Sequence, residues 1–331
     1  MKIGIFTAFD NLNKKAINAC IDLGLDYEIV DILSPDWVEN VRKSDADGFF
    51  CPSTLRNQEC KTILDERYYF VSQIMHRPIY PNFLGLFIHE NKRNMAAWLD
   101  YYNIPHTPTY VFVDKNQALE YVRQCQYPIV VKANVGAAAS KVLIIKNKKE
   151  AERYVKKVFP TEKWILGRFN FGKWYWNKYK FFKIPDISNA QKNYVIIQDY
   201  QKIKWEWRIL KIGDSYFGHQ KLLKGEFASG SDRVGWVKPP RELLDLVRNI
   251  CATGDFPCMD VDVFETVEGK YLVNELQASF GSYLDYQMSI DGVHGRYVWR
   301  DGDYHFEEGD FNTFGSNRLK LEHFVKLLQE K

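Results

Sequence analysis

Two neighbouring segments of this 331-residue sequence alternate strictly between polar and apolar side chains. They are residues 259–264 and 270–277, and Glu268-Gly269 between them is typical of a hairpin turn. A chain with this pattern must form an antiparallel ribbon that has one polar and one apolar face. With a two-residue loop, Asp262 faces Glu275, and Asp260 faces Gln277. The core face is then expected to carry Val261, Val263, Leu272 and Leu276.

The polar face of this ribbon indicates a cation site. Carboxylates that face each other across two strands lie about 5 Å apart, and like charges at that distance destabilise a hairpin. Hard oxygen ligands at this density suit Mg²⁺, which uses one or two carboxylates together with water and substrate phosphates. We therefore predict a cation site on the face that carries Asp260, Asp262, Glu275 and Gln277. The alternative is a solvated face on which one carboxylate is protonated or paired with a lysine.

The first 90 residues predict a different kind of sheet. Short apolar runs at residues 3–6, 27–32 and 49–51 are separated by helical patterns at 14–23 and 57–75. Strand and helix alternation with short connections is typical of a parallel sheet. From about residue 109 short strands follow one another with tight turns, which favours antiparallel sheet. Further helices are expected at 91–102, 115–125, 148–158, 239–252 and 317–329.

The predicted fold class is α/β, with an α+β C-terminal part. The length allows about two domains, or three small ones. We place the boundaries so that 1–90 is an N-terminal α/β domain, 91–195 a central subdomain and 196–331 a C-terminal subdomain with the metal site.

Composition and charge exclude several classes of protein. A net charge of +3 gives no indication of nucleic-acid binding. No run of 18 apolar residues is present, so no transmembrane helix is expected. The N-terminus reads as a strand and not as a signal peptide. The six cysteines form no Cys-x-x-Cys pair, which favours reduced thiols and a cytoplasmic protein. The seven histidines give no catalytic triad or zinc motif.

Two further constellations carry candidate chemistry. The strand 127–132 ends at Lys132 and is followed by small residues at 134–141, whose backbone N–H groups can approach an anion closely. Glu206 and Arg208 are two apart on a predicted strand and point the same way, suited to a ribose and to phosphate. The alternative is a surface ion pair. Lys221 precedes another small, polar loop at 226–231 that could cradle an anion.

These motifs in this order resemble the ATP-grasp superfamily over roughly residues 80–280. The resemblance is nearest to the carboxylate–amine ligases, which include D-alanine–D-alanine ligase and the ribosomal-protein glutamate ligases. It implies a Rossmann-like domain before the ATP-grasp fold and antiparallel sheets that sandwich the nucleotide. Gln277 departs from the family pattern, which has Asn there. The 227–231 stretch is similar to a subset of ATP-grasp proteins linked to bacterial surface glycans.

The resemblance also implies roles for individual residues. Asp262, Glu275 and Gln277 would hold Mg²⁺. The catalytic group is expected to comprise Arg208, Lys221, Ser229 and Gly230. The residues expected to bind ATP are Lys92, Lys132, Gly136, Ser140, Lys141, Gln198, Asp199, Tyr200 and Glu206.

The expected activity is an ATP-dependent ligation of a carboxylate to an amine through an acyl phosphate. The expected partners are a small-molecule or glycan acceptor and an amine donor, without nucleic acid. Two alternatives stay open: a phosphotransferase on the same fold that acts on an alcohol or sugar, and a nucleotide-binding scaffold without turnover. A homodimer is also compatible with the sequence.

Residues 160–193 are unusually aromatic and basic, with nine aromatic side chains and seven Lys or Arg against two acids. Three interpretations remain open for them: a packed lid, a surface that stacks on sugars or binds a polyanion, and a peripheral membrane contact. A surface of the second kind predicts an acidic glycan or glycolipid acceptor, whose uronic carboxylate would be amidated.

Overall fold

The computed structural model describes residues 1–9, 11–52, 57–136, 142–159, 193–228 and 233–330. Contacts divide the chain into two compact units. Unit 1 comprises Met1–His106 and Lys202–Lys331, and unit 2 comprises Thr107–Gln201. Unit 2 is therefore an insertion in the chain of unit 1. The expected domain boundaries near residues 90 and 195 stay a prediction.

Unit 1 begins with a parallel sheet in the order β2-β1-β3-β4, which confirms the prediction for the first 90 residues. α1 buries Ala16, Ala19 and Cys20 on one face, as its apolar spacing predicts. The elements of this part are β1 (Lys2–Thr7), α1 (Lys14–Asp22), β2 (Asp26–Asp31), α2 (Trp37–Lys43), β3 (Gly48–Phe50), α3 (Gln58–Tyr69), a π-helical turn (Phe70–Ile74), β4 (Ile79–Tyr80), α4 (Phe83–Ile88) and α5 (Lys92–Tyr101).

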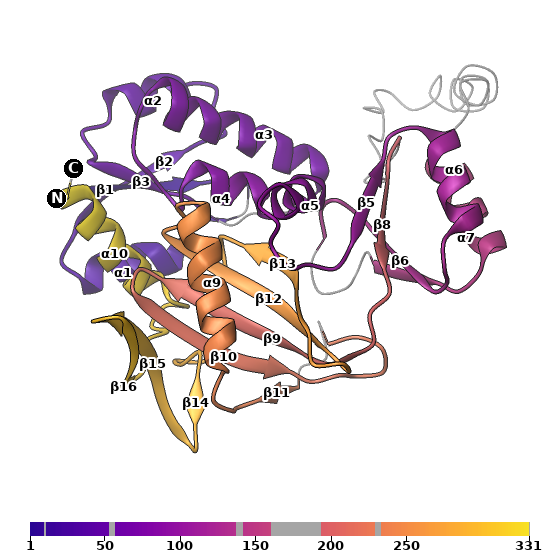
Figure 1. Ribbon diagram of the computed structural model, residues 1–331. Coiled ribbons are helices and arrows are strands. Elements are labelled where there is room, and N and C mark those ends of the chain that lie inside the picture. The colour runs from indigo at the N-terminus through magenta and orange to yellow at the C-terminus, as the bar shows by residue number, and fades with distance from the viewer. Residues whose placement is uncertain (10, 53–56, 137–141, 160–192, 229–232, 331) are drawn as a thin grey trace. The chain divides into compact units, whose positions relative to one another are not determined.

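The second sheet of unit 1 is antiparallel, in the order β13-β12-β9-β10-β15-β14, with β11 paired to β10 and β16 to β15. α9 lies across β9 and β12 (Figure 1) and packs Leu243 and Val247 into the same core as Val261 and Val263. The elements are β9 (Ile203–Ile212), β10 (Ser215–Lys221), β11 (Val234–Gly235), α9 (Arg241–Thr253), β12 (Cys258–Thr266), β13 (Tyr271–Gln277), β14 (Ser289–Ile290), β15 (Val293–Arg300), β16 (Asp303–Glu308) and α10 (Asn317–Gln329).

The β12–β13 ribbon has the predicted facing pairs, but it reaches them by a different route. Asp262 faces Glu275 and Asp260 faces Gln277, as expected. The loop, however, has three residues instead of two, because Thr266 N–H donates to the carbonyl of Lys270. The register then shifts by one residue between Asp262 and Val263, which leaves Asn274 as the extra residue of a bulge. The longer loop shifts the pairing by one residue and the bulge shifts it back, so the carboxylates face each other as predicted.

The bulge overturns one predicted core residue. Val263 faces Val273 across the ribbon, and Val273 is buried in the core. Leu272 faces Phe264 instead, on the face that carries the acidic residues, and both side chains are half-buried. The placement of Leu272 on the core face was therefore wrong, because strict alternation does not hold through a bulge.

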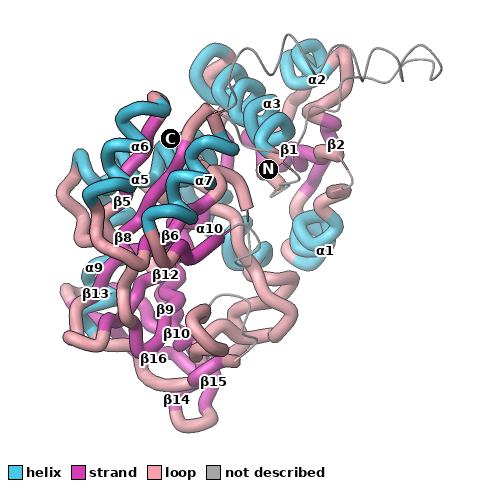
Figure 2. The backbone as a smooth tube through the Cα atoms, turned by 90° about the vertical axis from the view of Figure 1, so that its right-hand side faces the viewer, coloured by secondary structure: helices cyan, strands magenta, loops and turns pink. Residues whose placement is uncertain are grey.

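Unit 2 is an antiparallel sheet in the order β5-β8-β6-β7. α6 and α7 lie on one face of this sheet (Figure 2), where Ala118, Val122 and Val155 pack against Ile129, Val131 and Ile197. The elements are β5 (Thr109–Phe112), α6 (Lys115–Gln124), β6 (Ile129–Lys132), β7 (Val142–Ile145), α7 (Lys148–Val158) and β8 (Val195–Asp199).

The predicted helices are all present, with small changes at their ends. The sequence reading missed two short ones, α2 and α4, whose seven and six residues are too few to show a helical period. The six cysteines are unpaired, and four of them are buried. Among the described residues, no helix is long and apolar enough to cross a membrane.

Candidate active site

Polar and charged side chains gather on one face of four neighbouring strands, β10, β9, β12 and β13. The strand register brings them together, since Glu206 faces Lys221 and Arg208 faces Asp262, which in turn faces Glu275. α9 covers the opposite face of these strands. The face with these charges is referred to below as the acidic cluster, and its members are Glu206, Arg208, Lys221, Asp260, Asp262, Asn274 and Glu275.

Asp262 is the most heavily engaged carboxyl group of the acidic cluster. Arg208 donates to both of its oxygens, at 3.1 Å from Nε and 3.2 Å from Nη2, and Lys221 Nζ lies 2.5 Å from Oδ2. Burial opposes the charge on Asp262, but Arg208 and Lys221 outweigh it and hold the pKa of this carboxyl far below its usual range. Asp262 is therefore an anion at neutral pH.

Glu206 is equally buried and shares Lys221 with Asp262. Lys221 Nζ lies 2.7 Å from Glu206 Oε1, and the Asn274 amide donates to Oε2 at 3.0 Å. Burial raises the pKa of Glu206, although Lys221 opposes the shift. Glu206 and Arg208 are thus not the surface ion pair that was the alternative, because Glu206 is buried, Arg208 is half-buried, and each holds different partners.

Glu275 has its own cation, since Lys92 Nζ lies 3.2 Å from its Oε1. Lys92 is the first residue of α5, which the Asn91 side chain caps. The Lys92 side chain is buried and also lies 3.9 Å from Glu90. Lys92, a predicted site residue, thus contacts Glu275, which is a proposed metal ligand.

Asp260 is fully buried, with Arg208 Nε 3.0 Å from its Oδ2. Burial raises its pKa to about 7, although Arg208 opposes the shift. The acidic cluster therefore holds four carboxyl groups, which face its own cations Arg208 and Lys221 and the neighbouring Lys92. The alternative of a protonated or lysine-paired carboxylate describes individual members correctly, but this face is buried and not solvated.

The cluster offers carboxylate oxygens, which are the kind of ligand that Mg²⁺ prefers. Asp262 and Glu275 offer facing carboxylate oxygens, and the half-buried Gln277 lies on the same face beside Asp260. The described residues contain no group of three or more His, Cys, Asp or Glu placed to hold a metal ion. Mg²⁺ bound with a triphosphate needs only one or two carboxylates, so the pair is sufficient in number. An ion here would share Asp262 with Arg208 and Lys221.

Unit 2 carries the other predicted nucleotide residues. Lys132 and Gln198 lie on the sheet face opposite α6 and α7, and both are buried. Gln198 donates to Thr109 Oγ1 at 3.0 Å. Asp199 points the other way, because its carboxylate bonds to Tyr121 on α6. Its side chain is thus separated from that of Gln198. Burial raises the pKa of Asp199.

The remaining predicted residues differ in how far the structure describes them. Tyr200 follows β8 and is half-buried, as is Gly136 after β6. Asn134 in the same loop donates its N–H to the Tyr194 hydroxyl at 3.2 Å. The predicted residues Ser140, Lys141, Ser229 and Gly230 lie outside the described residues, and so does the aromatic stretch apart from Asn193.

Sequence reasoning missed two members of this site. Asp260 was counted on the polar face of the predicted cation site but was left out of the assigned site residues, although its spacing of two from Asp262 was a usable signal. The place of Asn274 in the site could not be predicted from the sequence, because its contact with Glu206 depends on the bulge. A third feature was also missed: Lys320 interrupts the buried face of α10 formed with Leu321 and Phe324, and this is a readable signal of a buried charge.

Residues 90–167 match the family model of the phosphoribosylglycinamide synthetase ATP-grasp (A) domain. A phosphoribosylamine–glycine ligase of Clostridium acetobutylicum is 33% identical over 167 residues, which are 48% of this chain and 34% of that protein. The chain therefore spans about a third of the length of the curated relative it matches.

Solved structures extend the likeness to the whole chain. A D-alanine–D-alanine ligase from Bacillus anthracis complexed with ATP has a TM-score of 0.58 at 16% identity and covers 100% of this chain and 99% of its own. A D-cycloserine synthetase has a TM-score of 0.61 at 15% identity, with 99% and 100% covered. These structures share the fold of this chain and, with the match of residues 90–167, they support the resemblance to ATP-grasp proteins seen in the sequence.

Proposed function

We propose that this protein is an ATP-dependent ligase that joins a carboxylate to an amine. A carboxylate oxygen of the substrate attacks the γ-phosphorus of ATP, and the bond from that phosphorus to the ADP oxygen breaks. The amine nitrogen then attacks the carbonyl carbon of the acyl phosphate. The carbon–oxygen bond to phosphate breaks, and the nitrogen loses a proton to give the amide. No side-chain nucleophile is needed, which agrees with the missing triad.

The observation that carries the proposal is the acidic cluster itself, within an ATP-grasp fold. Phosphoryl transfer depends on positioning and on charge stabilisation more than on covalent chemistry by the protein. Mg²⁺ held by Asp262 and Glu275, with Gln277 as a further oxygen ligand, would neutralise charge on the phosphate oxygens. Arg208 and Lys92 of unit 1 would supply fixed positive charge for the transferring group, and Lys221 keeps Glu206 and Asp262 in place. Lys132 of unit 2 is a further candidate for contact with the phosphates.

The nucleotide assignments extend to residues with less structural support. Glu206 is proposed to hold the ribose hydroxyls, and Gln198, Asp199 and Tyr200 the adenine. The loop that contains Gly136, Ser140 and Lys141 would cover the triphosphate. Ser229 and Gly230, after Lys221, are proposed to contact the developing oxyanion. The acid substrate is a small molecule or an acidic glycan, and the glycan proposal rests on the 226–231 and 160–193 stretches alone.

The test is ADP and phosphate release by the full chain across a matrix of acids and amines. Asp262→Asn should lower the rate by at least about 100-fold, because the charge that orders the cluster is lost. The matched control is Glu268→Gln, which removes an exposed carboxylate from the loop of the same ribbon and should leave the rate unchanged. Unchanged turnover in Asp262→Asn would overturn the proposal.

The same assay separates the two alternatives. A phosphotransferase releases ADP without free phosphate and transfers the phosphoryl group to an alcohol or sugar. A scaffold binds ATP without forming ADP. A ligase releases both products only when an acid and an amine are present together.

A further inference from the structure

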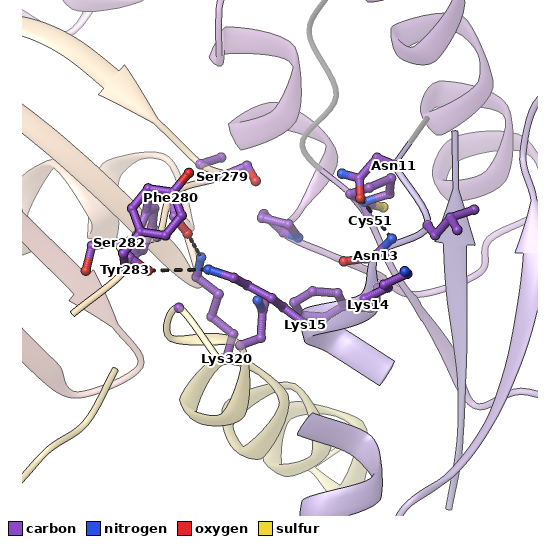
Figure 3. A pocket seen from close by; sticks show the side chains of 18 residues that line it. Asn11, Asn13, Lys14, Lys15, Cys51, Ser279, Phe280, Ser282, Tyr283 and Lys320 are labelled. Atoms are coloured by element: carbon purple, nitrogen blue, oxygen red, sulfur yellow. Dashed lines mark hydrogen bonds between the residues drawn. The ribbon is translucent and has the colours of Figure 1, made fainter. Parts of the chain in front are cut away.

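A second candidate site lies in unit 1, in a cavity of about 630 Å³ next to the acidic cluster. Figure 3 shows its walls, which come from the start of α1, the segment after β3, the segment after β13 and the start of α10. A volume of this size is typical of small-molecule sites. None of the nucleotide residues assigned above lines it.

The charged side chains among the described lining residues of this cavity are all positive. Its described lining includes three lysines, Lys14, Lys15 and Lys320, and no aspartate or glutamate. Within the described part of the chain, none of the three forms an ion pair with a carboxylate. The other polar groups of the lining are neutral, and Asn11, Asn13 and Asn317 are among them. The chemistry of this lining therefore favours an anion.

Lys320 makes the excess charge unusual, because its side chain is 3% exposed. Its Nζ donates to the Phe280 carbonyl at 2.6 Å and lies 3.6 Å from the Phe280 ring centroid. Lys15 reaches the same segment, with its Nζ 3.4 Å from the Ser282 carbonyl and 5.3 Å from the Tyr283 ring centroid. Figure 3 shows both lysines pointing at residues 280–283. No carboxylate of the described residues forms an ion pair with this buried ammonium, so its charge is costly, and a bound anion would offset that cost.

The cavity adjoins the acidic cluster through β13 and β12. Its wall at Ala278 directly follows Gln277, and Cys258 Sγ donates to the Ala278 carbonyl. Asp260 lies close enough to Lys320 for its charge to act on the lysine. A small molecule in this cavity can therefore have one end at the lysines and the other at the end of the ribbon that carries the proposed metal ligands.

On the basis of the proposed ligase activity, we propose that this cavity binds the acid substrate and that this acid carries a second anionic group. Lys14, Lys15 and Lys320 hold the second group, which is a phosphate monoester or a second carboxylate. The reacting carboxylate is left free to face the acidic cluster. The specificity of the enzyme for its acid thus resides in α1 and α10, outside the nucleotide-binding residues.

The test is calorimetric titration of the full chain with two dianions, succinate and ribose 5-phosphate, and with uncharged ribose. At least one dianion should bind, more weakly as salt is added, whereas ribose should not. Lys15→Gln removes an exposed charge and should weaken binding by about tenfold or more. Lys320→Met, which keeps the length of the side chain, should do the same.

The matched control is Lys326→Gln, which lies on α10 but on its exposed side and does not line the cavity. It should leave dianion affinity unchanged. Absence of binding by both dianions, or equal loss in Lys15→Gln and Lys326→Gln, would overturn the proposal. Preference for one dianion identifies the second group as a carboxylate or a phosphate.

These outcomes are separate from those of the ligase test. If the chain binds a dianion through Lys15 and Lys320 but Asp262→Asn leaves turnover unchanged, the ligase proposal fails and the anion site stands. If turnover depends on Asp262 but Lys15→Gln and Lys320→Met leave dianion affinity unchanged, the acid is bound elsewhere and only the present proposal fails.

Discussion

Arg208 lies between two buried carboxyl groups and determines the protonation state of at least one of them. Its guanidinium forms a two-pronged contact with Asp262 and also approaches Asp260. Planar, bidentate geometry of this kind is specific to arginine. Buried ion pairs add little net stability, but removal of one partner leaves an uncompensated charge in a medium of low polarity.

Loss of Arg208 is therefore expected to be far more damaging than loss of a surface arginine. Arg208→Ala should lower the free energy of unfolding by about 3–5 kcal/mol, because the buried Asp260 and Asp262 lose the cation that they share. The control is Arg42→Ala, which breaks an exposed pair with Glu39 and should cost less than about 1 kcal/mol. Urea unfolding of both variants measures the difference. Equal losses would show that the cluster is hydrated and not buried.

Lys320 gives the proposed anion site a dependence on pH. Burial lowers the pKa of its ammonium to about 8, and the groups that act on it are Lys15, His89, Cys258 and Asp260. Below this pKa the lysine is charged and attracts an anion, and above it the lysine is neutral. Affinity should therefore fall as the pH rises through about 8.

Succinate suits this measurement, since both of its carboxylates stay ionised at neutral and alkaline pH. Calorimetric titration at pH of about 7 and about 9.5 should show the loss of affinity in the native chain. The variant Lys320→Met should bind succinate weakly at both values, with little change between them. A native affinity that stays constant over this range would exclude Lys320 from the site.

At the scale of elements, the β12–β13 ribbon shows how far a sequence pattern reaches. Alternation predicts the facing pairs Asp262–Glu275 and Asp260–Gln277, and the structure confirms them. It does not predict the three-residue loop or the bulge at Asn274, which depend on Gly269 at φ 81° and on the contact between Asn274 and Glu206. The local spacing of polar residues therefore predicts which carboxylates face each other. The bulge depends on contacts with β9, which the local spacing does not contain.

The turn itself can be tested at Gly269. Its positive φ is costly for any residue with a side chain, although a Cβ there would meet no neighbour within 4 Å. Gly269→Ala should lower the free energy of unfolding by about 1–2 kcal/mol from backbone strain. ADP release should stay normal, because the register at Asp262 is also held by pairing with β9. Loss of ADP release with Gly269→Ala would show that the turn alone sets the register.

Prediction from sequence also worked better for secondary structure than for side chains brought together from distant segments. The parallel sheet, the antiparallel sheets and the long helices follow from apolar spacing. The cavity with Lys14, Lys15 and Lys320 joins positions some 300 residues apart, at the start of α1 and in α10, and the only local sign was one lysine on an apolar helix face. Such convergence depends on tertiary packing, which no single stretch of sequence contains.

At the scale of the whole molecule, the chain enters and leaves unit 2 once each, and each unit has a hydrophobic core of its own. The proposed anion site and the acidic cluster belong to unit 1, whereas Lys132 and Gln198 belong to unit 2. Units with separate cores commonly unfold as separate cooperative blocks. A ligand that binds in one unit should therefore stabilise that unit alone.

Hydrogen exchange followed by peptide mass spectrometry can measure this for the full chain. A dianion at about 100 times its dissociation constant should add about 2.7 kcal/mol of protection to the core strands β9 and β12 of unit 1. Protection of β6 and β8 in unit 2 should not change, and Lys15→Gln should remove the effect in unit 1. If protection rises equally in both units, the chain unfolds as one cooperative block, and binding in the cavity is energetically linked to the strands that carry Lys132 and Gln198.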